Sequence, residues 1–536
     1  MSTTYLVMLI LVIVYIPIWI WVWRRPEQAA RWHLVKYGPC IMIKTQLGMK
    51  TMDRLAKYTR FWHAFGFFSK LVSAVLFLLM MYMLIVAVIA LPSTLSSGTS
   101  IGIEYALAIP GFNPIMPLTY GIVALFFAMV VHELGHGIQA RVNGIKVDSS
   151  GLLYAVVPLG AFVEPNEEEM ETKPRKAKID VYAAGITVNT VWAVVAMLLM
   201  VAACGCVSSD YGDTAGVYYV DSGSPAYDAG IETTDLIIGI SDEDGNLLIG
   251  ENEAGQTAGE LTTTTSGSLA FLDYDFDPTR QYYLTYVSED GTHTSGLVQM
   301  GLYIKAVTSG SGAEAAGITA GSFIYSMTLD GETTYVTGYQ NFIALMNETE
   351  SGDVVTIVTV SDMDEDGSYE FEEFTVTLTA NGSIGFLGVS TTTGGLTFTT
   401  PNLLLDAAAN PFYGADTATE YVTYFLSYLS GPFNGMDPIS DEVEWWYDAP
   451  LDGVWWVFIR LMYWIFWLDI LLAISNALPT YVLDGGFIFA GGVSWLLEKL
   501  RVGDEERREK LTESITGSVS NVVLFLFLLV IIAMIL

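Results

Sequence analysis

The stretch VVHELGHGIQA, residues 130–140, carries two of the chain's five histidines with a glutamate between them, and it ends a long apolar segment. In a helix, His132 and His136 lie one turn apart on the same face, so both imidazoles can reach one metal ion, and Glu133 projects beside them. Burying such groups in hydrocarbon costs on the order of several kcal/mol unless a metal or a polar cavity compensates. The stretch therefore predicts a metal site inside a membrane helix.

The composition supports a membrane location. The chain has 536 residues, of which 52% are hydrophobic, with a mean hydropathy of +0.44. Several apolar stretches are long enough to cross about 30 Å of hydrocarbon. We expect a polytopic α-helical membrane protein with about six transmembrane helices and an inserted extracytoplasmic β-rich region, and a first span retained as an anchor. The expected spans are Thr4–Trp23, Leu71–Leu91, Leu118–Ala140, Ile179–Val207, Val454–Leu478 and Ile515–Leu536.

The basic residues orient these spans. Ten lie in Arg24–Lys70, six in Arg141–Lys178 and five in Lys499–Lys510, whereas residues 208–453 hold only two of the 24. Because Lys and Arg in short loops stay preferentially on the cytoplasmic side, we expect both termini outside. This orientation predicts a multi-pass plasma-membrane protein whose metal site lies near the cytoplasmic side.

The segment 208–453 is strongly acidic, with 39 of the 58 Asp and Glu residues. Such a surface repels phosphate, so we expect no nucleic-acid partner. A saline exterior and simple solubility both remain open as explanations. Cys40, Cys204 and Cys206 are too few for a disulfide framework.

The same segment contains a repeat and reads as β-rich. VDSGSPAYDAGI (220–231) and VTSGSGAEAAGI (307–318) match at eight of twelve positions with an offset of 87 residues. Two copies of one small domain are the economical interpretation. We expect membrane regions at 1–207 and 454–536, repeat domains at 208–300 and 301–391, and an extracytoplasmic linker or amphipathic segment at 392–453.

The repeated signature resembles PDZ domains of bacterial membrane proteases. That resemblance implies a groove between a strand and a helix that receives an extended peptide, including peptide C-termini. MGLYI (300–304) and AGVYY (215–219) are the expected carboxylate-capturing loops of the second and first copies. A tandem that acts only as a steric plug over the membrane region remains the alternative.

One acidic stretch fits a calcium loop. DMDEDGSYEFEE (362–373) would place Asp362, Asp364, Asp366 and Glu373 as oxygen ligands around a turn at Gly367. Its flanks have the pattern of strands, so an acidic hairpin with an Asp-Gly turn explains it equally well. Ca²⁺ in the outer region is therefore one of two open interpretations.

A catalytic zinc ion takes three protein ligands and keeps one open position, so a third ligand must come from elsewhere in the chain. The best candidate is Asp484 in SNALPTYVLDGG (475–486), which follows a span that ends on the cytoplasmic side. Pro479 and the pair Gly485-Gly486 break the helix there. Irregular backbone at membrane depth is tolerated where it lines a cavity.

The pairing of an intramembrane H-E-x-x-H with a distant N-x-x-P-x-x-x-x-D-G resembles the site-2 protease family of intramembrane zinc metalloproteases. GLLYAVVPLGAFVEP (151–165) is similar to the family's re-entrant β-structure, and AAGITVN (183–189) is similar to its A-G-x-x-x-N helix, with Ile186 at a usual proline. The resemblance implies zinc held by His132, His136 and Asp484, Glu133 as general base and then acid, Asn476 positioning the substrate or oxyanion, and Asn189 shaping the site.

The implied function is zinc-dependent cleavage of transmembrane segments of single-span proteins in the lipid bilayer, with the PDZ pair as a substrate filter or reader. A catalytically inactive scaffold that binds exported C-termini is the principal alternative, and a transporter is a third. Asp469 shares a helix face with Asn476, and support of a ligand histidine and a helix-bundle contact both remain open for it.

Overall fold

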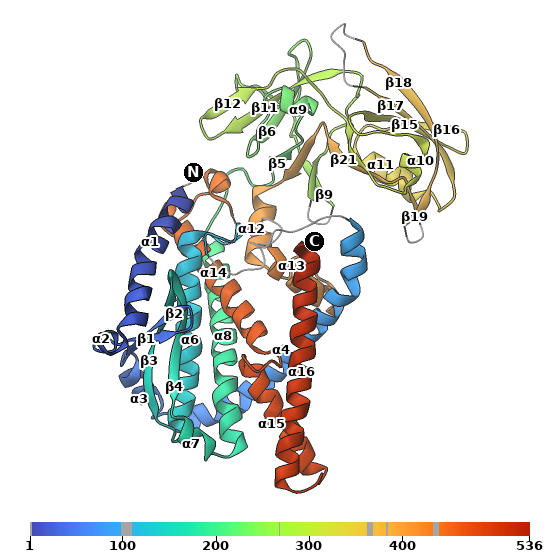
Figure 1. The fold of residues 1–536 in the computed structure, drawn as a ribbon. Coiled ribbons are helices and arrows are strands. Elements are labelled where there is room, and N and C mark those ends of the chain that lie inside the picture. Colours follow the sequence, from blue (N-terminus) through green and yellow to red (C-terminus); the bar gives the residue numbers. More distant parts are fainter. Residues whose placement is uncertain are drawn as a thin grey trace. The chain divides into compact units, whose positions relative to one another are not determined.

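The computed structural model describes residues 3–97, 110–266, 269–361, 368–381, 384–431 and 439–535 (Figure 1). The chain divides into two compact units. The helical unit comprises Met1–Ala203, Leu429–Gly435 and Val457–Leu536, and the β-rich unit comprises Cys204–Tyr428 and Met436–Trp456.

The helical unit is built from long apolar helices, which satisfy every backbone hydrogen bond internally, as a segment in lipid must. They are α1 (Thr3–Arg24), α4 (Thr59–Ser97), α6 (Leu118–Val142), α8 (Arg175–Cys204), α14 (Gly453–Asn476), α15 (Asp484–Lys499) and α16 (Glu505–Ile535). Five helices of the described part are long and apolar enough to cross a membrane: Thr59–Pro92, Leu118–Val142, Arg175–Cys204, Gly453–Asn476 and Glu505–Ala533. The first expected span is helical as well, but its described apolar part, Ile10–Arg24, is shorter.

A four-stranded antiparallel sheet accompanies α6. Its strands are β1 (Leu34–Tyr37), β2 (Cys40–Thr45), β3 (Val147–Ala155) and β4 (Val157–Pro165), in that order, so β4 is an edge strand. The stretch 151–165 thus forms strands, as expected, but the pairing of β2 with β3 was not foreseen. Gly151 permits this pairing, because a Cβ there would lie 2.0 Å from the carbonyl oxygen of Ile43.

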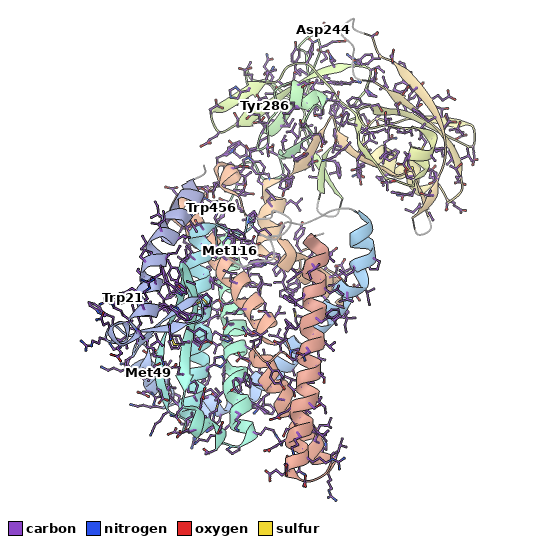
Figure 2. The ribbon with its side chains drawn as sticks, in the orientation of Figure 1. Trp21, Met49, Met116, Asp244, Tyr286 and Trp456 are labelled. Atoms are coloured by element: carbon purple, nitrogen blue, oxygen red, sulfur yellow. The ribbon has the colours of Figure 1, made fainter. Side chains whose placement is uncertain are left out.

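Two apolar clusters fix the sheet and its short helices α2 (Pro26–Ala30), α3 (Met49–Leu55) and α7 (Glu167–Glu171). In the first cluster, Met49 and Met52 of α3 pack with Ile138 of α6. In the second, Trp21 of α1 packs beside Ile41 of β2; Trp21 and Met49 are labelled in Figure 2. The end of α6 that carries the histidines is therefore held by the first cluster, which also includes Val147 of β3 and Val181 of α8.

The β-rich unit contains the two repeats. The first repeat holds β5 (Ala215–Val220), α9 (Pro225–Asp228), β6 (Leu236–Asp242), β7 (Leu247–Glu251), β8 (Thr257–Ala258), β9 (Thr263–Ser266), β10 (Leu269–Leu272), β11 (Gln281–Ser288), β12 (Gly291–Thr294) and β13 (Val298–Gln299). The second holds β14 (Leu302–Val307), α10 (Gly312–Ala316), β15 (Phe323–Leu329), β16 (Glu332–Tyr335), α11 (Tyr339–Asn347), β17 (Val354–Val360), β18 (Phe371–Thr377), β19 (Thr379–Asn381), β20 (Ile384–Phe386) and β21 (Val389–Thr393). After them come β22 (Leu396–Thr399), α12 (Pro401–Ala409), α13 (Ala418–Ser430) and the 3-10 helix η2 (Asp441–Trp446).

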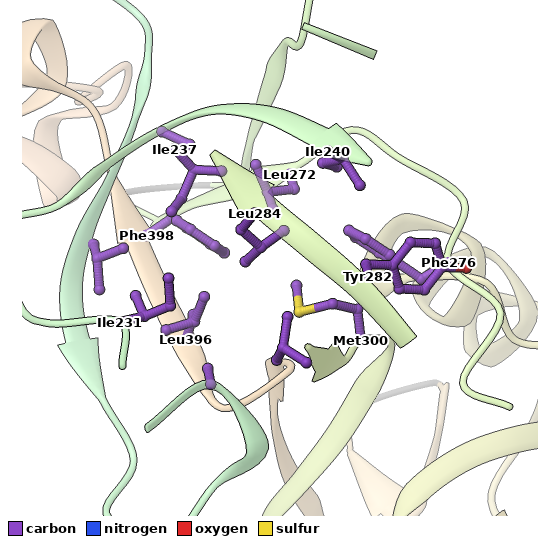
Figure 3. Close-up of a cluster of buried hydrophobic side chains, with 14 of the residues drawn as sticks. Ile231, Ile237, Ile240, Leu272, Phe276, Tyr282, Leu284, Met300, Leu396 and Phe398 are labelled. Atoms are coloured by element: carbon purple, nitrogen blue, oxygen red, sulfur yellow. The ribbon is translucent and has the colours of Figure 1, made fainter. Parts of the chain in front are cut away.

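Each repeat has its own apolar core, but the two are nested. Leu396 and Phe398 of β22 belong to the core of the first repeat, where they lie beside Leu284 of β11 (Figure 3). β22 also pairs with β5 of the first repeat. The expected linker 392–453 therefore begins too early, because its first strand completes the first repeat after the second has been inserted.

The repeated sequence has the same structural role in both copies. Ser224 and Ser311 cap the short helices α9 and α10 by accepting a hydrogen bond from a backbone N–H of the first turn. Gly395 and Gly388 pack against these two serines, each with a φ of +89°, and a Cβ at either would lie within 2.2 Å of a serine side-chain atom. The two glycines thus let the chain before β21 and before β22 pack directly against the capping serine of each repeat.

Asp235 makes the stability of the β-rich unit depend on pH. Burial raises its pKa to about 6 from an ordinary 3.8. The folded state therefore binds the proton more tightly than the unfolded state, so the stabilising contribution is complete below about pH 4 and is lost as the pH rises to about 6. We expect Asp235→Asn to remove about 1–3 kcal/mol of this pH dependence.

The measurement is denaturant unfolding of the full-length protein between pH 4 and 7, with proteolysis reporting on the β-rich unit. Asp228→Asn, at an exposed position, is the matched control and should leave the pH profile unchanged. Equal profiles for Asp235→Asn and wild type would contradict the prediction.

Candidate metal centre

His132 and His136 converge with Asp484 in the helical unit. The histidines are one turn apart on α6 and buried, with 7% and 8% of their surface exposed. Their Nε2 atoms lie 3.1 Å and 3.2 Å from Oδ2 of Asp484. All three ligand atoms lie within 4.8 Å of one another, so the structure brings together the three residues expected to hold zinc.

The other ring nitrogen of each histidine has a fixed partner on α8. Nδ1 of His132 lies 3.1 Å from Oδ1 of Asn189, and Nδ1 of His136 lies 2.8 Å from the carbonyl oxygen of Val181. Because Asn189 donates its own amide to the carbonyl oxygen of Ala128, its Oδ1 faces the ring. Both rings therefore donate from Nδ1, which leaves a lone pair on Nε2, the arrangement of a metal-ligating histidine.

The three unprotonated ligand atoms suit a bound cation. The two Nε2 lone pairs face Oδ2 of Asp484, which has no hydrogen-bond donor among the described residues. Three acceptors at this spacing repel one another unless a positive ion lies between them. Two imidazoles and a carboxylate, with room for a fourth ligand, are a typical donor set for catalytic zinc.

Glu133 lies on the side of α6 that faces the sheet. Its Oε2 accepts a 2.8 Å hydrogen bond from the backbone N–H of Val163 in β4. Since β4 is the edge strand, Glu133 is held at the sheet edge next to the two histidines. This is the position that a proton-transferring group beside a metal requires.

Glycines allow the helices to approach the imidazoles. A Cβ at Gly185 of α8 would lie 2.5 Å from Nε2 of His136, and one at Gly135 would lie 3.0 Å from the carbonyl oxygen of Ala184. A Cβ at Gly137 would meet Sδ of Met52 at 2.3 Å. The atoms that these Cβ atoms would meet belong to the chain itself, so Gly135 and Gly137 serve helix and sheet packing.

Asp484 is the first residue of α15. The positive end of a helix dipole stabilises a carboxylate at this position. The preceding segment folds back on the helix, since a Cβ at Gly485 would lie 2.4 Å from the Ala477 carbonyl, and one at Gly486 would lie 2.1 Å from the Thr480 carbonyl. The two glycines therefore permit the tight turn that brings Asp484 to the histidines.

Two other residues singled out in the sequence, Asn476 and Asp469, make no hydrogen bond to the metal-ligating side chains among the described residues. Asn476 donates to the carbonyl oxygen of Leu472 on its own helix, and its role toward substrate stays a prediction. Asp469 is fully buried, and neither carboxylate oxygen has a hydrogen-bond partner among the described residues. The Nδ1 partners of both histidines are already assigned, so Asp469 is not their support.

Sequence reasoning missed three contributors to the site. The carbonyl of Val181 and the N–H of Val163 are backbone groups, which leave no signature in the sequence. The third is Asp180, which is buried and pairs with Lys70 of α4. It precedes Val181, so this ion pair fixes α8 where it contacts His136.

The expected calcium loop lies largely outside the described residues. Asp362, Asp364 and Asp366 lie outside the described residues. Glu373 lies on β18, paired in register with Val358 of β17. The flanks are strands, as expected, and calcium stays a prediction.

Comparisons with known proteins agree with this geometry. The model of peptidase family M50 matches residues 120–508, which include His132, Glu133, His136 and Asp484. The uncharacterized protein MJ0971 of Methanocaldococcus jannaschii is 34% identical over 152 residues, covering 28% of this chain and 40% of the relative. Because the family match extends over more than half of the chain, the protein belongs to peptidase family M50, the site-2 protease family of membrane metalloproteases.

Proposed function

We propose that the protein is a zinc-dependent intramembrane endopeptidase that cleaves transmembrane segments of single-span membrane proteins. The observation that carries the proposal is the convergence of His132, His136 and Asp484 beside Glu133, on helices of membrane-spanning length. The test is incubation of the purified protein with a panel of single-span substrates, with and without a zinc chelator. Products that form equally in both would reject the proposal.

The residues of the chain divide the chemistry among them. His132, His136 and Asp484 would hold zinc, which when bound polarises a carbonyl group and makes water a better nucleophile. Glu133 removes a proton from the attacking water and delivers it to the leaving amine nitrogen. The N–H of Val163 orients the Glu133 carboxylate, and Asn189 keeps the His132 ring in the ligand tautomer.

A transmembrane helix hides its carbonyl groups in internal hydrogen bonds, so the substrate must unwind before it is cleaved. The edge strand β4 supports this step, because the hydrogen-bonding groups on its outer side are not used by β3, and the N–H of Val163 is the one that donates to Glu133. An unwound segment can add to that edge as a further strand. The edge passes Glu133 at Val163, so a strand bound there would lie beside the metal centre.

The complete site favours an enzyme over the alternatives. An inactive scaffold has no need for Glu133 beside three metal ligands. Buried ionisable residues on several spans, such as Asp469 and the Asp180–Lys70 pair, also occur in transporters. The convergence of three metal-ligating groups beside Glu133 favours the peptidase. We further propose a multi-pass plasma-membrane protein, with the site near the cytoplasmic side and the β-rich unit outside the cell, from the distribution of basic residues.

We propose that the second repeat is a PDZ-like peptide reader. A cavity of about 470 Å³ separates α11 from β21 and is lined by Phe342, Ile343 and Met346. β21 pairs along one edge with β14 and meets β22 only at Thr393. Its other edge therefore faces the cavity and can accept an extended peptide.

The groove lies elsewhere than expected. MGLYI (300–304) contributes to β14, which pairs with both β15 and β21, and AGVYY (215–219) lies in β5, which pairs with both β22 and β6. A strand with two neighbours has no free edge for a peptide. In the first repeat, β22 is flanked by β5 and β10. A strand of the chain itself, β10, therefore takes the place that a peptide would take beside β21 in the second repeat.

Ile343→Asp is expected to weaken peptide binding by the β-rich unit at least tenfold, because it places a charge in the apolar groove. Ala344→Asp, at an exposed position on the same helix, is the matched control and should bind as wild type does. The measurement is fluorescence anisotropy with peptides selected from a C-terminal library on the full-length protein. Equal affinities for the two variants would contradict the groove assignment.

A further inference from the structure

A second cavity lies in the helical unit, next to the metal centre. It has a volume of about 290 Å³ and is formed between α4 and α15. Its lining residues are Ser73, Ala74, Phe77, Ala477, Gly485, Ile488, Phe489, Gly492, Val493 and Leu496. Gly485 follows the metal ligand Asp484, and Ala477 follows Asn476, so two lining residues are chain neighbours of residues singled out for the candidate metal centre.

The wall of this cavity contains an unpartnered hydroxyl group. Ser73 is 2% exposed, and its Oγ has no hydrogen-bond partner among the described residues. Several other hydroxyls on the helices of this unit bond to a carbonyl one turn earlier, as Ser69 does to Phe65 and Ser475 to Leu471, whereas Ser73 and Thr516 have no partner among the described residues. A buried hydroxyl without a partner costs about 1–3 kcal/mol. Ser73 therefore has room for a polar partner from outside the described residues.

Gly492 gives a second, independent indication. Glycine inside a helix is less stable than alanine by about 0.5–1 kcal/mol. At Gly485 the chain requires it, because a Cβ would lie 2.4 Å from the backbone carbonyl of Ala477, and at Gly491 a Cβ would lie 2.7 Å from the side chain of Ile179. A Cβ at Gly492 would meet nothing within 4 Å. The missing side chain keeps the cavity open without serving the packing of the protein.

We propose that this cavity receives an apolar side chain of the cleaved segment, from a residue close to the scissile bond. The inference rests on the proposed peptidase function and names what its site selects. The stacked rings of Phe77 and Phe489, 6.1 Å apart, join the two helices at the cavity wall. Ser73 hydrogen-bonds to the backbone of the unwound segment, a partner that a lipid tail cannot offer. The substrate side chain would thus fill the cavity, and the unwound substrate backbone would provide the hydrogen-bond partner of the Ser73 hydroxyl.

The first experiment fills the cavity. Once the scissile bond is mapped by mass spectrometry, the residues on either side of it are varied among Ala, Leu and Phe. Wild type should prefer a large side chain at one of these positions, and Gly492→Leu should lower the ratio of kcat/KM for Phe over Ala there at least tenfold. Val75→Leu, at an exposed position of α4 outside the cavity, should keep the wild-type ratio. An unchanged ratio in Gly492→Leu, or an equal loss for all substrates, would overturn the inference.

A second experiment does not depend on catalysis. In a Glu133→Gln background with the three native cysteines replaced, Gly492→Cys should form a disulfide with a substrate cysteine at one or two adjacent positions, and Val75→Cys should not. Crosslinking spread evenly along the substrate, or none, would overturn the inference. A selective crosslink without cleavage by the wild type would reject the peptidase function and support the cavity as a binding site. Cleavage without a selective crosslink and without an altered preference would support the peptidase function and reject the cavity as a substrate site.

Discussion

Glu133→Gln is expected to lower the rate of substrate cleavage by about 10²–10⁴-fold. Glutamine keeps the shape of the side chain, and its carbonyl oxygen can still accept the hydrogen bond from Val163, but it cannot take the proton from the attacking water. The bound zinc should remain, because Glu133 is not one of the three ligands. The measurement is the initial rate of product formation from a single-span substrate in detergent or liposomes, together with zinc content.

The matched control is Glu164→Gln. Glu164 follows Val163 in β4, but it pairs with Lys44 of β2 instead of facing the metal centre. This variant should retain most of the activity, so a general effect of losing a carboxylate from the sheet can be distinguished from loss of the base. Comparable cleavage by wild type and Glu133→Gln would reject the assigned base.

Asp484→Ala is expected to lower the affinity for zinc at least a hundredfold and to abolish cleavage. Loss of a partner that only orients a ligand already costs about 10–100-fold in metal affinity, and loss of a ligand costs more. Without the carboxylate, the two Nε2 lone pairs of His132 and His136 have no anionic partner to complete a three-ligand site. The measurement is zinc content after dialysis against buffers of defined free zinc concentration.

Asp469→Asn is the matched control, since Asp469 is also a buried carboxylate of the helical unit but has no hydrogen-bond partner among the described residues. It should retain wild-type zinc content. Full zinc occupancy in Asp484→Ala would show that the third ligand has been misassigned. Zinc loss in both variants would indicate a general disturbance of the helices.

The long spans and the H-E-x-x-H helix could be predicted because their signals are local. Hydropathy over about 20 residues identifies a helix that can cross a membrane, and the spacing of His132 and His136 places them on one helix face. The structure has α6 over Leu118–Val142, close to the expected span. The likeness of the repeats to PDZ domains is still a prediction, although each repeat has a core of its own.

The groove and the nested repeats could not be predicted, because strand pairing is not local. The sequence does not show that β22 returns to the first repeat after the second is complete, nor that β14 has a neighbour on each edge. Which edge stays free for a peptide depends on those partners. The repeated motif therefore indicated the two copies, but the strands it suggested for the proposed groove, β14 and β5, have a neighbour on each edge.

The sequence by itself determined the membrane helices, the two histidines with their glutamate, and, through the resemblance to site-2 proteases, Asp484 as the third ligand. Only the tertiary structure decided which backbone groups hold the site, since Val181 and Val163 act through a carbonyl and an N–H that any residue type could supply. It also decided which glycines the chain itself requires, because the room for a Cβ depends on neighbours far away in sequence. That contrast separates Gly485, packed against Ala477, from Gly492, which has open space.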